Sequence, residues 1–146
     1  MSTIRTEAST GLQLMELIRD GQLPPPPAAV LLGLEIEDVG DGAITFAFTS
    51  DDRFSNFTTT HGGILAAVAD FALSTAVWTC LAAGADLVTT NLSVTYLRPV
   101  PLAGRYRCVG RSVHQGRRLA HAEAEMTDEQ GRAVMRATAT LHVRTD

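Results

Sequence analysis

The sequence predicts one α+β domain in which a long buried helix is wrapped by a curved antiparallel β-sheet. The helix is expected at 62–81, where the side chains are apolar on nearly every side, and strand-like alternation lies before and after it. A chain of 146 residues is long enough to bury such a core without disulfides or a metal. Because one helix leaves part of the sheet and its edges uncovered, we expect the chain to form a homo-oligomer. Our prediction is a homodimer that assembles into a homotetramer, although the sequence does not decide between dimer and tetramer.

The residues before the domain are predicted to form a lead-in. Residues 10–20 have the apolar spacing of a helix that ends at Gly21. The prolines 24–27 are expected to block any further helix and to act as a stiff, extended spacer. We therefore divide the chain into a lead-in at 1–33 and a single domain at 34–146.

The predicted strands alternate between apolar and polar side chains. The first two are joined by a Gly-Asp-Gly turn and form a hairpin ahead of the helix. The predicted ranges are 34–39, 43–49, 88–97, 106–113, 119–126 and 133–143.

The net charge of −4 is unevenly distributed along the chain. Residues 1–97 carry 3 arginines against 11 acidic residues, whereas 98–146 carry 9 arginines against 5 acidic residues. A basic half in an acidic protein suits a small phosphorylated ligand better than a nucleic acid. The alternative is that the arginines form the solvated face of an antiparallel strand.

Composition also bears on compartment and metal binding. A carboxylate within the apolar run, Asp70, would be costly in lipid, so no membrane span is expected. Charged residues interrupt 1–20, which argues against a signal peptide. Cys80 and Cys108 are predicted to be free thiols of a cytoplasmic protein, and no cluster has metal-ligand spacing.

His61-Gly62-Gly63 opens the predicted helix. Glycines let a ligand approach the backbone, and the N–H groups of the first helical turn have no partner within the helix. Such a helix start can polarise a carbonyl or stabilise an oxyanion, although a tight loop-to-helix turn would also explain it. His61 has two open interpretations, a general base or an anchor for the loop and the substrate.

Asp70 lies two turns into the helix among apolar and small side chains. A carboxylate in such a place must be paired, hydrogen-bonded or functional, because burial of the bare charge is costly. No basic residue lies three or four positions away, so we predict a catalytic carboxylate. Ser74, one turn later, is placed to contact the substrate.

The sequence resembles the phenylacetate-pathway type of acyl-CoA thioesterase of the hotdog superfamily, from about 34 to 143. The specific feature is His-Gly-Gly with an aspartate nine residues after the histidine; weaker features lie at 94–99, 116–119 and 128–131. The resemblance implies hydrolysis of an aromatic or medium-chain acyl-CoA. In that role Asp70 is nucleophile or general base, and the Gly62 N–H polarises the carbonyl. A hydroxyl on the next strand helps place the water: Thr89 by position, whereas the alternation of the strand places Thr90 on the apolar face.

The resemblance also implies where coenzyme A binds, as part of the substrate and with no separate cofactor. The basic strands would hold its phosphates, which makes Arg98, Arg117 and Arg118 candidates. The family usually has an asparagine six residues before the histidine and a glycine between them. Here Ser55 occupies that place, and Asn56 follows it. We predict that Asn56 and Gly63 contact the substrate.

Two other functions remain open: a hotdog hydratase or dehydratase of acyl thioesters, and a non-catalytic acyl-CoA-binding module. For the thioesterase, geometry adds one expectation. Gly62 and Asp70 are about 12 Å apart along a helix axis, too far to act on one thioester carbon. We therefore predict that each active site takes Gly62 from one subunit and Asp70 from its neighbour.

Overall fold

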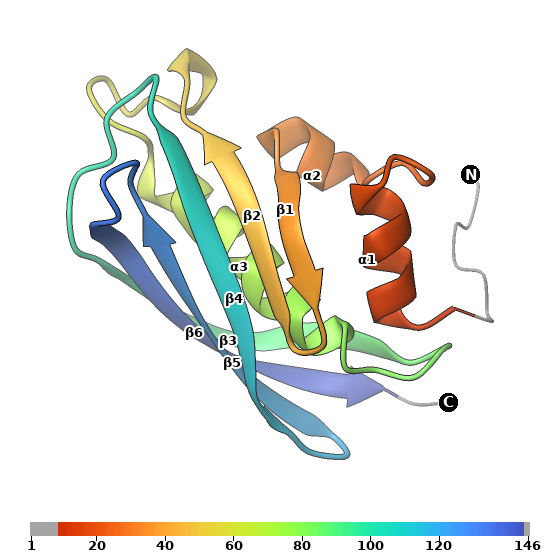
Figure 1. The fold of residues 1–146 in the computed structure, drawn as a ribbon. Helices are drawn as coiled ribbons and strands as arrows, with labels where there is room; N and C mark the ends of the chain where they lie inside the picture. The colour runs from red at the N-terminus through yellow and green to blue at the C-terminus, as the bar shows by residue number, and fades with distance from the viewer. Residues whose placement is uncertain (1–8, 145–146) are drawn as a thin grey trace.

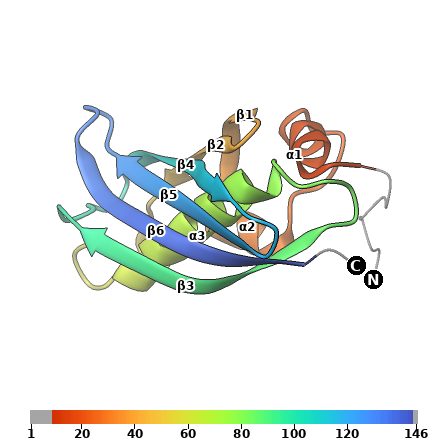
Figure 2. The ribbon, with the colours of Figure 1, turned by 90° about the horizontal axis from the view of Figure 1, so that it is seen from below.

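The computed structural model describes residues 9–144, in which an antiparallel sheet of six strands curves around one long helix (Figures 1 and 2). The strand order is β1-β2-β4-β5-β6-β3, so β1 and β3 are the edge strands. The elements are α1 (Gly11–Arg19), α2 (Pro27–Leu32), β1 (Glu35–Gly40), β2 (Ala43–Thr49), η1 (Asp52–Phe54), α3 (Gly62–Trp78), β3 (Asp86–Tyr96), β4 (Arg105–Gln115), β5 (Leu119–Thr127) and β6 (Ala133–Arg144). This architecture confirms the hotdog fold that the resemblance implies.

The first helix, α1, begins and ends where the sequence predicts. Thr10 and Gln13 form a reciprocal capping box, and Gly21 follows the helix with a φ of 72°. Gly11 is buried against α3: a Cβ built on it would lie 2.1 Å from the carbonyl oxygen of Trp78. Only glycine allows this approach, which fixes α1 against the end of α3.

The proline run is not a continuous extended spacer, and this prediction is wrong at its last residue. Pro27 starts the short helix α2, which ends at Gly33 in the left-handed conformation. Proline is tolerated at the first helical position because the N–H that it lacks would have no helical partner there. Of the predicted lead-in, residues 1–8 lie outside the described part of the chain, and 9–33 pack against β1 and α3.

The central helix α3 is covered on one side only within a single chain, which corrects the expectation of burial on every side. Val68, Ala69, Ala72, Leu73 and Ala76 are fully buried against the sheet. The opposite stripe of the helix remains wholly or partly accessible in one chain; it comprises Gly63, Ala67, Asp70, Ser74 and Trp78. An apolar helix with an accessible stripe is what an oligomer interface would require.

Strand β3 departs from simple alternation. Its pairing with β6 shifts register between Thr89 and Asn91, which marks a β-bulge at Thr90. The shift reverses the faces on either side of it, so Val88 is 43% exposed although the alternation of the sequence places it on the apolar face. Thr89 lies on the side of the sheet that faces α3, and Thr90 is exposed.

Both cysteines are free thiols in the described structure, as predicted. Cys108 is fully buried, and that burial raises its pKa to about 12. No helix among residues 9–144 is long and apolar enough to cross a membrane. Within the same range, no three His, Cys, Asp or Glu side chains are grouped to hold a metal ion.

Candidate active site

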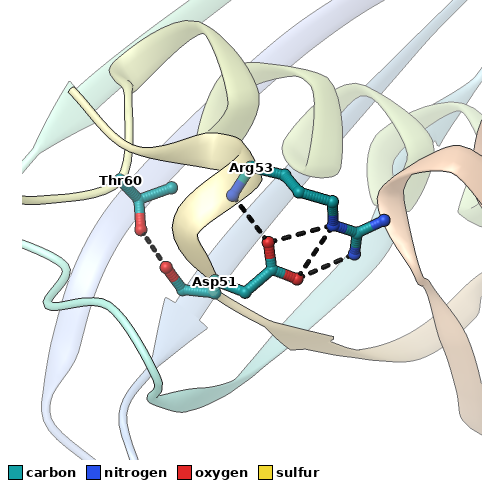
Figure 3. A network of polar contacts seen from close by, with 4 residues as sticks. Asp51, Arg53 and Thr60 are labelled. Carbon is teal, nitrogen blue, oxygen red and sulfur yellow. Dashed lines mark hydrogen bonds and ion pairs between the residues drawn. The ribbon is translucent and has the colours of Figure 1, made fainter.

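The loop before α3 is held in place by buried and surface polar contacts (Figure 3). The hydroxyls of Ser50 and Thr60, both buried, share a hydrogen bond, and Thr60 N–H donates to the carbonyl of Val100 at 2.9 Å. On the surface, Asp51 accepts hydrogen bonds from the backbone and side chain of Arg53, and these bonds lower the pKa of the Asp51 carboxyl. The start of α3 is thereby fixed relative to the sheet.

His61 is the N-cap of α3. Its Nδ1 accepts a hydrogen bond from the Gly63 N–H at 2.9 Å. A ring nitrogen that accepts this bond carries no proton, and the neutral ring then has its proton on Nε2. The geometry therefore favours the anchoring role of His61, because a general base would have to give up the cap.

The Gly62 N–H is the free donor at this helix start. Among the residues that the structure describes, no acceptor lies within hydrogen-bond reach of it. Its own carbonyl accepts a hydrogen bond from the hydroxyl of Tyr96 at 2.6 Å, and a Cβ on Gly62 would lie 3.2 Å from the Tyr96 ring. A larger residue at this position would therefore have to push the Tyr96 ring aside.

Tyr96 is a site residue that sequence reasoning missed. It ends β3, half exposed, and its ring reaches across to the first turn of α3. Strand alternation assigns it to the apolar face, which gives no sign that its hydroxyl holds the carbonyl of Gly62. A contact between residues 34 positions apart leaves no local signature in the sequence.

Asp70 is partly buried on the accessible stripe of α3. One of its carboxylate oxygens accepts a hydrogen bond from the Thr89 hydroxyl at 2.8 Å. No ion pair to Asp70 forms within residues 9–144, so the structural pairing considered above is absent from this range. Ser74 donates to the backbone carbonyl of Asp70 at 2.6 Å.

The β-bulge decides between the two candidate hydroxyls. Thr89, not Thr90, reaches Asp70, while the Thr90 hydroxyl donates to the carbonyl of Thr140 at 3.0 Å and is exposed. The position that the resemblance implies is therefore the one that contacts the carboxylate. Simple alternation selects Thr90 because it cannot include the extra residue of a bulge.

The structure does not bring the remaining predicted contacts together in one chain. Gly62 and Asp70 lie on one helix, about 12 Å apart along its axis. Arg98 follows β3 and donates to the carbonyl of Ala133. Arg117 and Arg118 lie in the turn between β4 and β5, at the opposite end of the sheet from Arg98. Asn56 is exposed in the loop before α3.

Comparison with known proteins adds the family to this geometry. A family model described as the Thioesterase superfamily matches residues 57–135, more than half of the chain. A mouse protein named acyl-coenzyme A thioesterase 13 is 28% identical over 86 residues; the match covers 58% of this chain and 61% of the mouse protein. The chain thus matches only about three fifths of that relative's length.

Two solved structures support the same assignment. A putative thioesterase from Ralstonia eutropha, described as a phenylacetic acid degradation-related protein, is 31% identical with a TM-score of 0.80, covering 87% of this chain and 97% of that one. A hypothetical thioesterase from Streptococcus pneumoniae, solved with coenzyme A, is 29% identical with a TM-score of 0.71 and coverages of 77% and 87%.

Proposed function

The chain belongs to the thioesterase superfamily, and we propose on this basis that it hydrolyses an acyl-CoA thioester to a free acid and coenzyme A. The observation that carries the proposal is the Asp70 carboxylate, which is partly buried, hydrogen-bonded by Thr89 and without an ion-pair partner within 9–144. A thioester hydrolase needs a carboxylate of this kind as general base or nucleophile, and this favours the catalytic interpretation of Asp70 over the structural one. The coenzyme A part of the substrate is supported by the Streptococcus pneumoniae relative and by the mouse relative's name.

In this mechanism Asp70 supplies the negative charge that drives the attack. As general base it removes a proton from water while the water oxygen adds to the thioester carbon; as nucleophile its own oxygen adds first and water then hydrolyses the anhydride. The hydrogen bond from Thr89 engages one carboxylate oxygen and leaves the other for the reaction. In both routes the carbon–sulfur bond breaks, and the coenzyme A thiolate takes up a proton.

The carbonyl oxygen becomes negatively charged during the attack, and the Gly62 N–H is suited to stabilise it. This donor lies at the positive end of α3 and has no other acceptor among the described residues. Tyr96 fixes the peptide that follows Gly62 through its carbonyl. The donor is therefore held in place before the substrate arrives, which reduces the cost of reorganisation.

We further propose that the site is shared between two subunits. One thioester carbon must lie within about 3.5 Å of the attacking oxygen while its own oxygen accepts the glycine N–H. Gly62 and Asp70 are about 12 Å apart along α3, so two antiparallel copies of the helix would meet this demand. The accessible stripe of α3 and the open edge of β3 support such a homodimer. Its assembly into a homotetramer and a cytoplasmic location remain predictions.

The test of the activity is the release of thiol from saturated acyl-CoA substrates by the wild type and by Asp70→Asn. We expect turnover by the wild type and a loss of about 10² to 10⁴ in kcat for the variant, the usual size of a general-base effect. Glu123→Gln, on the outer face of β5, is the matched control and should retain wild-type kcat. If Asp70→Asn retained more than a tenth of the wild-type kcat, Asp70 would not be the catalytic carboxylate.

The same assay separates the two alternative functions. A hydratase or dehydratase needs an unsaturated or hydroxylated acyl chain, so it releases no thiol from a saturated substrate. A binding module would retain acyl-CoA without turnover, and Asp70→Asn would change nothing measurable.

A further inference from the structure

A groove of about 390 Å³ lies beside the proposed site, between the N-terminal helices and α3. Its walls come from α1, the proline segment and α2, β1, β2 and α3, and most of its lining is apolar. The side chains that matter below are Met15, Ile18, Pro25, Phe46, Phe71 and Trp78. None of the reaction steps above uses this groove.

The groove and the proposed site are neighbours along α3. Ser74 lines the groove and also donates to the backbone carbonyl of Asp70. Along the helix axis, Ser74 lies about 6 Å from Asp70 and Trp78 about 12 Å. A thioester carbon held at Asp70 would therefore have its acyl chain at the start of the groove within one helical turn.

A second hollow, of about 160 Å³, also borders Ser74 and Trp78, on the side of β3. Its lining includes Asp86, which forms an ion pair with Arg144 at 2.6 Å. An apolar chain placed there would remove water from these charges without replacing their hydration. The larger groove also borders two charged residues, Arg19 and Glu35, but the rest of its wall is mostly apolar, so an apolar chain can lie along it away from these charges.

We propose that this groove binds the acyl group, so that α1 selects which acyl-CoA is hydrolysed; this proposal rests on the proposed thioesterase activity. The volume lies at the low end of the range for ligand pockets, which suits a compact, apolar acyl group such as an aromatic or a medium-length chain. Each buried methylene should raise kcat/KM by about fourfold until the groove is full. Beyond that length the gain should stop or reverse.

The packing of α1 makes it a fixed wall. Gly11 lies against the backbone of Trp78, and Met15 is buried in the core, 4% exposed. Ile18 is only partly buried and faces the groove. A larger side chain at Ile18 would therefore fill the groove without replacing a core residue.

The experiment measures thiol release from straight-chain acyl-CoAs of increasing length and from aromatic acyl-CoAs. Ile18→Trp should lower kcat/KM for the longer and the aromatic substrates by at least tenfold and leave acetyl-CoA within about twofold. Trp78→Leu should shift the preferred chain length upward, because it enlarges the groove. Val113→Trp, at a site 61% exposed on β4, is the matched control and should leave the whole profile unchanged.

Binding of non-hydrolysable acyl-CoA thioethers, measured by calorimetry, separates the two proposals. If no thiol is released but binding grows with chain length and Ile18→Trp abolishes that growth, the hydrolysis is refuted and the acyl groove is retained. If thiol is released and neither Ile18→Trp nor Trp78→Leu changes the chain-length profile, the groove proposal is overturned and the hydrolysis stands.

Discussion

Two variants that are each inactive should restore activity when their subunits are mixed, if the active site is shared. Asp70→Asn removes the negative charge of the attacking carboxylate. Gly62→Val disrupts the helix start that binds the thioester carbonyl. A Cβ on Gly62 already lies 3.2 Å from the Tyr96 ring, so valine must displace that ring or the first turn of α3. Valine keeps the backbone N–H but displaces it, and loss of one well-placed donor of this kind typically lowers kcat by about 10² to 10³.

The expected recovery follows from counting sites. In a mixed dimer, one site contains both substitutions and the other contains neither, because each site takes one residue from each subunit. Random exchange makes about half of the dimers mixed, and each has one intact site of two. The mixture should therefore regain about a quarter of the wild-type activity, far above either parent.

The assay is thiol release after the two variants are unfolded together and refolded. Subunit exchange is followed independently by mass spectrometry of differently labelled chains, and each variant refolded alone is the control. A mixture that exchanges subunits but stays as inactive as its parents would show that the site lies within one chain, against the 12 Å separation argued above. Recovery of more than about half of the wild-type activity would also contradict the expected number of intact sites.

The remaining predictions concern the residues around this site. Thr89→Ala should lower kcat about 10- to 100-fold, the size of a hydrogen bond to a charged group, while Thr90→Ala stays near wild type; equal effects would contradict the position of the bulge. Arg117→Ala or Arg118→Ala should raise KM for acyl-CoA more than it lowers kcat, because phosphate contacts far from the chemistry contribute uniform binding. Equal kinetics on acyl-CoA and on an acyl-pantetheine thioester, in wild type and variants, would count against that role.

The fold was predictable because its signals are local and strong. A long apolar run opened by two glycines indicates α3, and Gly-Asp-Gly between alternating runs indicates the β1–β2 hairpin. The sequence does not predict the α2 helix, because proline has two opposite effects. Inside a helix it interrupts the helix, whereas at the first helical position it is favourable, and the sequence does not show which effect applies at Pro27.

The site was only partly predictable. Asp70 stands out because a carboxylate in an apolar run needs an explanation, and Gly62 because it opens the helix. The cap from His61 and the contact from Tyr96 depend on side-chain geometry that spacing does not encode. The arginines follow from the resemblance and from the basic charge of the C-terminal half, and the structure separates Arg98 from the β4–β5 turn by the length of the sheet.

The bulge in β3 explains how one strand can contact both the start and the middle of α3. Thr89 and Tyr96 are seven positions apart, an odd number, so in a regular strand their side chains would point to opposite faces. The extra residue at Thr90 reverses the alternation once, and both side chains then face the helix. Thr89 thereby reaches Asp70 at 2.8 Å and Tyr96 reaches the carbonyl of Gly62 at 2.6 Å. Since β3 is also one of the two edge strands of the sheet, the strand that supports the carboxylate and the carbonyl-binding turn is available to pair with a second subunit. In a shared site, Asp70 of one subunit and Gly62 of the other would therefore each be supported by the β3 strand of their own subunit, and these two strands would lie at the interface.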